Sequence, residues 1–284
     1  MGATVLNDNS HSGSGESRSR ASSAERATAA IRFRIAGAAR FLSHAETFRV
    51  FQRACARAVL PVRYTEGFNP HPRLSLPLPR PVGVEADDEL LVARLHNDWE
   101  AGPVGKGSPV QCTALGVPNQ AQHEAAMKQA LAEQLPEGIE VLAVELAPAG
   151  TSFHPRSARY ILPVRTNDDA GLAERLRDAI ARVMASDRCM VERASGEGKA
   201  TKSVDVRPFL CSIRLEGANL LVQHLTGEGG SIRVDEIMRL LDLQTQDLAG
   251  PVCRTGVTWE TTKLKRTSHE PCMETRAEDI EDGT

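Results

Sequence analysis

The sequence predicts an α+β protein built from two tandem ferredoxin-like modules, each with the element order βαββαβ. Strand patterns and helix patterns follow one another in the same order twice along the chain, which is the split βαβ arrangement of ferredoxin-like domains. The 284 residues are enough for two ordinary domains. Hydrophobic residues make up 41% of the chain, so most of its length can contribute to a core.

The first module is predicted to span residues 30–148, with an insertion rich in Gly and Pro at 97–120. Its first helix begins at a capping box in which Ser43 is followed three residues later by Glu46. Its elements are expected in the order strand 31–35, helix 44–58, strands 62–64, 74–78 and 90–95, helix 125–135 and strand 139–146.

The second module is predicted to span residues 155–260, and Glu216–Asn219 reads as the turn of a hairpin. The expected elements are strand 160–164, helix 172–184, strands 189–192, 209–215 and 220–225, helix 234–241 and strand 252–259. Residues 1–29 and 261–284 are aperiodic and rich in polar or charged side chains, so both termini are predicted to be disordered tails.

Several classes of function have no signal in the sequence. No apolar stretch reaches the ~18 residues of a membrane span, and no signal-peptide core is present. The six cysteines form no CxxC pair, so we expect reduced thiols in a cytoplasmic protein. Motifs for a radical S-adenosylmethionine (SAM) cluster, a HExxH metal site and a GxSxG nucleophile are absent, so neither a metal nor another cofactor is expected. The acidic run Asp87, Asp88 and Glu89 is predicted to be a solvated turn.

Positive charge is concentrated in the first module, although the whole chain has a formal charge of −3. Between Ile31 and Arg80 there are nine arginines and two acidic residues. Arg49, Arg53 and Arg57 are spaced to line one helix face. A row of guanidinium groups suits phosphate, because each group can bind two anionic oxygens. The alternative is an ordinary solvated helix face on which Arg49 pairs with Glu46.

A stiff basic loop, Y-T-E-G-F-N-P-H-P-R-L-S, follows at residues 64–75. Pro70 and Pro72 fix the backbone on both sides of His71, and such preorganisation lowers the cost of ordering a binding site. His71 can exchange a proton near neutral pH, and Asn69 and Arg73 add hydrogen-bond donors. The alternative is a structural turn, in which Phe68 fills the core and His71 points into water.

Other candidate residues surround this loop or lie in the second module. His44 follows the helix N-cap, where free N–H groups favour an anion, and it would form one pocket with the loop if the two converge. Asp205 and Arg207 are predicted to share one side of a strand, either as a structural pair or as an extension of the basic groove. The predicted substrate-binding residues are Ser43, His44, Arg49, Arg53, Arg57, Asn69, His71, Arg73, Ser75, Asp205 and Arg207, and the catalytic candidates are His71 and His44.

The segment from FLSH at residue 41 through GFNPHP to LS at residue 75 resembles the radical-SAM-linked family of unknown function. The resemblance continues through LPEGIEVL (135–142) and KSVDVRPFL (202–210), and it covers roughly residues 30–260. One departure is that Ala45-Glu46 stands where the family usually has an acidic residue directly after Ser-His. The resemblance implies that a radical-SAM protein is the partner of this chain, which itself lacks the cluster motif.

These observations lead to three hypotheses for the function. The first is a non-catalytic accessory that binds RNA or another phosphate-bearing substrate for a radical-SAM partner. The second is an RNA-processing or RNA-modifying enzyme that uses His71 or His44 as acid or base, by analogy with RNA endonucleases that pair ferredoxin-like domains. The third is a scaffold that docks a partner protein. No catalytic motif decides whether the chain is an enzyme.

Overall fold

A computed structural model describes residues 27–96, 120–167, 170–194, 201–227 and 230–263. The predicted tails and the predicted insertion lie outside these ranges except at their edges. Residues 27–29 and 261–263 belong to the first and last strands, so both predicted tails are three residues too long. Residues 27–29 are not a tail because they pair with neighbouring strands on both sides.

The first half of the chain has the element order predicted for it. Its elements are β1 (Ala27–Ile35), a 3-10 helix (Gly37–Phe41), α1 (His44–Arg57), β2 (Leu74–Ser75), β3 (Glu85–Arg94), α2 (Gln120–Ala132) and β4 (Ile139–Pro148). The strands lie in the order β2-β3-β1-β4, and every neighbouring pair is antiparallel.

The second half has the same order, with one additional hairpin. Its elements are β5 (Thr151–Pro163), α3 (Ala170–Ala185), β6 (Met190–Ala194), β7 (Thr201–Asp205), a 3-10 helix (Arg207–Phe209), β8 (Leu210–Glu216), β9 (Asn219–Gly227), β10 (Gly230–Ser231), α4 (Val234–Leu240), a 3-10 helix (Thr245–Asp247) and β11 (Cys253–Lys263). The predicted hairpin turn is confirmed, since Glu216 pairs with Asn219.

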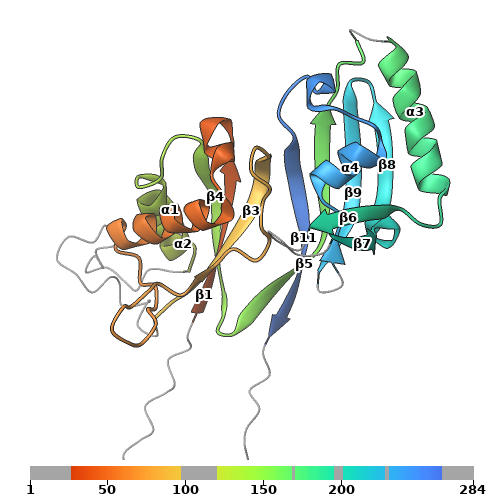
Figure 1. The fold of residues 1–284 in the computed structure, drawn as a ribbon. Coiled ribbons are helices and arrows are strands. Elements are labelled where there is room, and N and C mark those ends of the chain that lie inside the picture. Colours follow the sequence, from red (N-terminus) through yellow and green to blue (C-terminus); the bar gives the residue numbers. More distant parts are fainter. Residues whose placement is uncertain (1–26, 97–119, 168–169, 195–200, 228–229, 264–284) are drawn as a thin grey trace, which may run out of the picture.

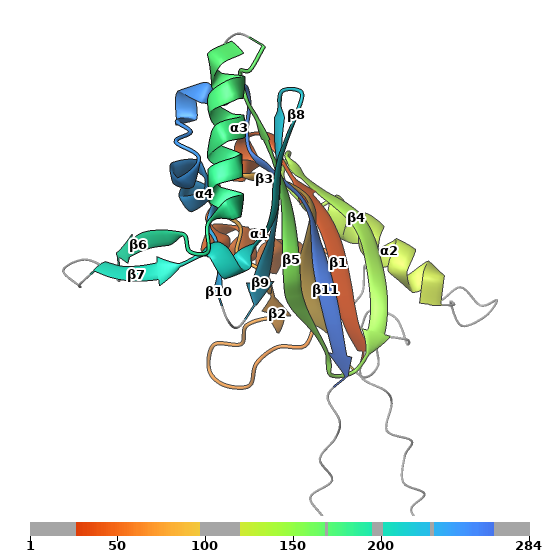
Figure 2. The same ribbon diagram turned by 90° about the vertical axis from the view of Figure 1, so that its right-hand side faces the viewer.

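The two halves are joined into one mixed sheet of nine strands (Figure 1). In the second half β8, β9, β5 and β11 are neighbours in that order, and all of these pairs are antiparallel. The junction is a short parallel pairing of β11 with β3, in which Cys253 lies opposite Glu85 and Arg254 opposite Ala86. The β6–β7 hairpin forms a separate sheet and projects away from the main one (Figure 2). The α+β class is confirmed, and the ferredoxin-like assignment of each half stays a prediction.

Each half has its own hydrophobic core between helices and sheet. In the first half Phe51 and Cys55 of α1 and Leu131 of α2 pack on buried side chains of β1 and β3. In the second half Leu176 of α3 and Ile237 of α4 pack on β5 and β9. In the part of the chain that the structure describes, none of the helices has the length and apolar character needed to cross a lipid bilayer.

The predicted start of α1 is confirmed by its hydrogen bonds. The Glu46 N–H donates to Ser43 Oγ at 3.3 Å, and the Ser43 N–H donates to the Glu46 carboxylate at 2.8 Å. The hydrogen bonds from Ser43 lower the pKa of the Glu46 carboxyl. The Ser43 side chain is therefore engaged in capping the helix.

Two predicted strands of the first half are shorter than expected. Residues 62–64 form only isolated bridges, between Val62 and Leu95 and between Tyr64 and Pro72. The alternating leucines form a ladder only at Leu74–Ser75, because the prolines that follow at 77 and 79 have no N–H to donate.

Candidate functional site

Three arginines of the basic first module are neutralised within the fold. Arg32 binds Asp88 with both ends of its guanidinium, Arg34 Nε lies 3.3 Å from Asp87, and Arg40 lies 3.7 Å from Glu85. All three acids belong to β3, so the run at 87–89 is part of a strand, and the predicted solvated turn is wrong. The local excess of positive charge is therefore smaller than the sequence of the module suggests.

A fourth arginine, Arg80, stabilises the backbone of the turn before β3. Its guanidinium donates to the carbonyl oxygens of Arg40 at 2.7 Å, Leu42 at 2.8 Å and Pro81 at 3.1 Å, and also to that of Val84. Burial lowers the pKa of this side chain. Arg80 is a structural residue, because all of these acceptors belong to the protein itself.

The remaining five arginines lie outside these pairs. Arg49, Arg53 and Arg57 are exposed on α1, as their spacing predicts. Arg49 helps to lower the pKa of Glu46, after the hydrogen bonds from Ser43. Within the described residues, Arg53 and Arg57 have no side-chain hydrogen bond or ion pair, and the same holds for the exposed Arg73 of the loop and for the half-buried Arg63 just before it. These four side chains can bind an external anion without giving up an internal partner.

The loop at 64–75 is a hydrogen-bonded hairpin that projects beyond the end of the sheet (Figure 2). The Thr65 N–H donates to the His71 carbonyl at 2.8 Å, and the His71 N–H donates to Thr65 Oγ1 at 2.9 Å. At its base the Arg73 N–H donates to the Arg63 carbonyl at 2.7 Å. Gly67 has a φ of 125°, which an L side chain rarely adopts. The loop is therefore held in shape by its own backbone, as its prolines predict.

The side chains of the loop tip point into solvent. Phe68 has a relative exposure of 105%, so the alternative in which this ring fills the core is wrong. Asn69 and His71 are exposed as well. These groups are available to a ligand, and no other element of the described chain covers them.

The structure does not bring His44 together with the loop in one pocket. His44 lines a small cavity with Leu78, Arg80 and Glu89. Leu74 packs against the core of the first half, whereas Arg73 and Ser75 on either side of it are exposed. The cavity at His44 is lined by none of residues 64–75, so the loop and the helix start do not converge there.

Asp205 and Arg207 have structural partners in the second half. The Asp205 carboxylate accepts from the N–H groups of Cys189 at 2.9 Å and Arg207 at 3.1 Å, which lowers the pKa of this carboxyl. The Arg207 guanidinium donates to the carbonyls of Ser186 at 2.9 Å and Met184 at 3.0 Å, at the end of α3. Arg207 lies in a 3-10 helix, so the two residues do not share one strand as predicted.

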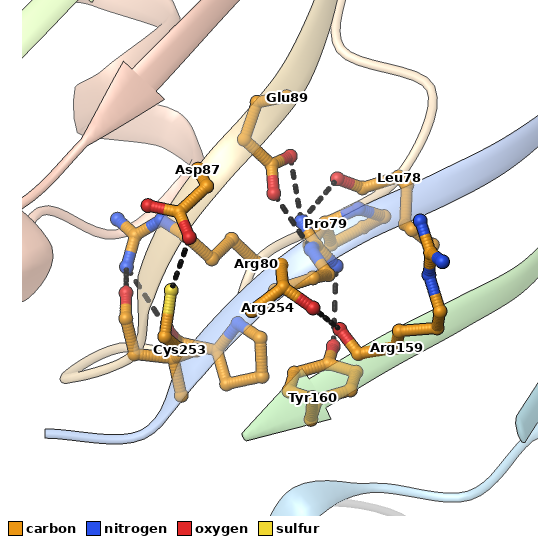
Figure 3. A network of polar contacts seen from close by, with 12 residues as sticks. Leu78, Pro79, Arg80, Asp87, Glu89, Arg159, Tyr160, Cys253 and Arg254 are labelled. Atoms are coloured by element: carbon orange, nitrogen blue, oxygen red, sulfur yellow. Dashed lines mark hydrogen bonds and ion pairs between the residues drawn. The ribbon is translucent and has the colours of Figure 1, made fainter. Parts of the chain in front are cut away.

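The sequence analysis missed a buried ion pair at the junction of the halves. The guanidinium of Arg254 on β11 binds the Glu89 carboxylate of β3 through Nε and Nη2, both at 2.6 Å (Figure 3). Arg254 is 1% exposed, and it also donates to the Pro79 carbonyl at 3.1 Å and to Tyr160 Oη at 3.4 Å. In the sequence, the signal for this ion pair was a single arginine, Arg254, within the apolar pattern Val252–Val257. Because the ion pair is enclosed by protein, we assign it to holding the halves together.

A buried histidine lies beside this ion pair. The His224 ring stacks on Tyr160 with centroids 5.4 Å apart, and its Nδ1 lies 2.8 Å from the Leu225 carbonyl. Burial lowers the pKa of His224, and the charge of Arg254 lowers it further. His224 is therefore held neutral in the folded protein.

We expect His224 to make the protein less stable as the pH falls. An unfolded histidine takes up a proton near pH 6.5, and the folded one resists doing so, so the free energy of unfolding decreases below that pH by up to about 1.4 kcal/mol per unit. Urea unfolding between pH 7.5 and 5.5 measures this slope. His224→Phe, which keeps an aromatic ring on Tyr160, should flatten it, and the exposed control His154→Gln should not. Equal slopes in all three proteins would refute this assignment.

A groove of about 940 Å³ also lies at the junction, between residues 77–79 and strands of the second half. Arg156 and Glu260 pair with each other in its wall, which leaves no net charge there. Among the described residues there is no group of three or more His, Cys, Asp or Glu side chains placed to hold a metal ion. The exposed arginines and the loop are therefore the best candidate for a functional site.

Comparison with protein families places the chain in one family. A family described as "Uncharacterized protein conserved in bacteria (DUF2344)" matches residues 29–104 and 99–234, which together cover more than half of the chain. The chain belongs to this family. The matched residues contain both α1 and the loop at 64–75, so the candidate site lies within the family domain. A search of proteins with curated function found no significant match.

Proposed function

We propose that this protein is a binding accessory that holds RNA, or another phosphate-bearing substrate, on the outward-facing arginines of α1 and of the loop at 64–75. The observation that supports the proposal is the division of the nine arginines. Arg32, Arg34, Arg40 and Arg80 bind partners within the protein and Arg49 lies near Glu46, whereas Arg53, Arg57, Arg63 and Arg73 have no side-chain partner in the described chain. Unpartnered guanidinium groups bind phosphate oxygens well.

The proposed architecture is a tandem pair of ferredoxin-like modules. It is supported by the strand orders β2-β3-β1-β4 and β8-β9-β5-β11, which place corresponding elements of the two halves at the same positions in the sheet. Ferredoxin-like sheets are common RNA-binding modules. The resemblance to the radical-SAM-linked family supports a radical-SAM protein as the partner that acts on the bound substrate. A cytoplasmic location accords with the free cysteines at 55, 189, 211 and 253.

The structure offers little support for the alternative in which the protein is itself an RNA-processing enzyme. His44 and His71 are both exposed and belong to separate sites. Within the described residues, neither imidazole has a recorded side-chain partner that would orient it as an acid or base. RNA cleavage that disappears in His71→Ala or His44→Ala would favour the enzyme.

The proposal predicts that RNA binding depends on the α1 arginines and on salt. In the variant Arg49→Gln/Arg53→Gln/Arg57→Gln, we expect weaker binding of a fluorescently labelled RNA at low salt. The plot of log affinity against log salt should lose about 2 units of slope, because each lost phosphate contact removes about 0.7. Fluorescence anisotropy over a range of salt concentrations measures both quantities.

The control is Arg177→Gln/Arg182→Gln, which removes two exposed arginines from α3 in the other half, so the losses are compared per charge removed. Equal losses in the two variants would mean that overall charge, and not the α1 face, drives binding. If the wild-type protein binds no RNA at low salt but retains a partner protein on purification, the scaffold hypothesis replaces this proposal.

A further inference from the structure

The phenylalanine at the tip of the loop has no role within the fold. Phe68 is the most exposed of the large hydrophobic side chains that the structure describes, at 105%, followed by Val82 at 60% and Phe41 at 59%. Phe41 is partly covered by the guanidinium of Arg40, which lies 4.5 Å from its ring centroid. Phe68 has no such cover, so its whole ring is available to stack on a flat surface.

The backbone presents this ring at a defined place. Two hydrogen bonds join Thr65 to His71, and one joins Arg73 to Arg63. Pro70 and Pro72 remove further freedom from the returning strand of the loop. Because the loop is ordered before a ligand arrives, little entropy is lost when the ring is buried in a complex.

The charges at the base of the same loop indicate what the ring binds. Arg63 and Arg73 lie at the base of the loop, and Glu66 is the one acidic residue between positions 64 and 75. An apolar pocket on a protein would bury the ring but leave both guanidinium groups without anionic partners. An unpaired nucleotide offers a partner to the ring and to the guanidinium groups, since its base has a flat π face and its phosphates are anionic.

We propose that Phe68 stacks on an unpaired base while Arg63 and Arg73, at the base of the loop, bind phosphates further along the same strand, so that the loop selects single-stranded RNA or RNA loops over duplex. This inference rests on the proposed RNA-binding function and names its substrate class. The arginine face of α1 supplies sequence-independent affinity, and Phe68 supplies the preference for bases that are not paired.

The test compares Phe68→Ala with wild type on a short single-stranded RNA and on its duplex. We expect Phe68→Ala to weaken single-strand binding about tenfold or more, the usual effect of removing one stacking ring, and to leave duplex binding unchanged. Phe41→Ala, which removes an exposed ring elsewhere, should bind both RNAs like the wild type. Glu66→Gln should tighten both interactions by removing a negative charge near the phosphates.

A second variant reports the stacking directly. In Phe68→Trp the new indole should lose fluorescence when single-stranded RNA is added, after subtraction of the wild-type signal from Trp99 and Trp259. Duplex RNA should cause little change.

Three results would overturn the inference. If Phe68→Ala binds the single strand as tightly as wild type while the α1 variant does not, Phe68 has no stacking role, but the proposed function survives. If the wild-type protein binds no RNA, both the inference and the proposed function are refuted. If the indole fluorescence of the Phe68→Trp variant responds to a purified partner protein and not to RNA, the ring occupies a protein pocket instead.

Discussion

Replacing Arg254 by methionine is expected to lower the free energy of unfolding by about 3 to 5 kcal/mol, because it leaves the Glu89 carboxylate buried without its counter-ion. Glu89 is 4% exposed, so water cannot replace the lost guanidinium. Methionine fills much of the same volume, which limits the contribution of an empty cavity. Urea unfolding at pH 7 followed by circular dichroism measures the loss.

A second variant distinguishes an unpaired buried charge from a loss of packing. The double variant Arg254→Met/Glu89→Leu removes both charges and should recover most of the lost stability. A double variant no more stable than Arg254→Met would show that packing, and not an unpaired charge, explains the effect.

The same ion pair determines how firmly the halves are joined. The parallel pairing of β3 and β11 is short, and one of its bonds runs from the Glu85 N–H to the Val252 carbonyl at 2.8 Å. In Arg254→Met we expect hydrogen exchange at Glu85 to accelerate more than at Ala36, whose N–H bonds to Gly138 within the first half. Equal acceleration at both amides would mean that the pair stabilises the whole fold evenly.

Local sequence patterns predicted the helices well because their signals lie within a few residues of each other. Ser43 and Glu46 located the start of α1, and the spacing of Phe51 and Cys55 identified its buried face. The strands were less well predicted at their ends. Residues 27–30 are small or polar and show no alternation, yet all four are buried because both faces of β1 are covered, one by the core of the first half and the other by a cluster that includes Phe153 and Trp259.

Among the candidate functional residues too, features set by adjacent sequence were predictable and features set by distant partners were not. The shared helix face of Arg53 and Arg57 followed from their spacing, and the fixed backbone at His71 followed from the prolines on either side of it. The partners of Asp87, Asp88 and Glu89 did not, because they come from strands brought alongside by the sheet, up to 166 residues away. A count of charges in a sequence window cannot find such partners, so it overestimated the free positive charge of the first module.

Gly138→Ala is expected to destabilise the protein by about 3 kcal/mol through backbone geometry alone. Gly138 has a φ of 87°, and a Cβ there would lie 2.6 Å from the Ala36 carbonyl oxygen and 3.0 Å from the Ala39 Cβ. The conformation costs an alanine about 1 to 2 kcal/mol, and relieving the contact adds about 1 to 3 kcal/mol. Ala36 cannot simply move away, because its N–H donates to the Gly138 carbonyl at 2.8 Å and so ties the end of β1 to the start of β4.

Gly217→Ala separates these two contributions. Gly217 also has a positive φ, of 60°, but a Cβ there meets nothing within 4 Å. The Gly217→Ala variant should therefore lose only the conformational part of the free energy of unfolding, about 1 to 2 kcal/mol. Thermal and urea unfolding of both variants measure the losses. If the two variants lose equal stability, the close approach of Ala36 is relieved at no cost. The connection between β1 and β4 is then softer than its hydrogen bond indicates, and the first half does not hold α1 and its arginines as rigidly as the proposed binding face requires.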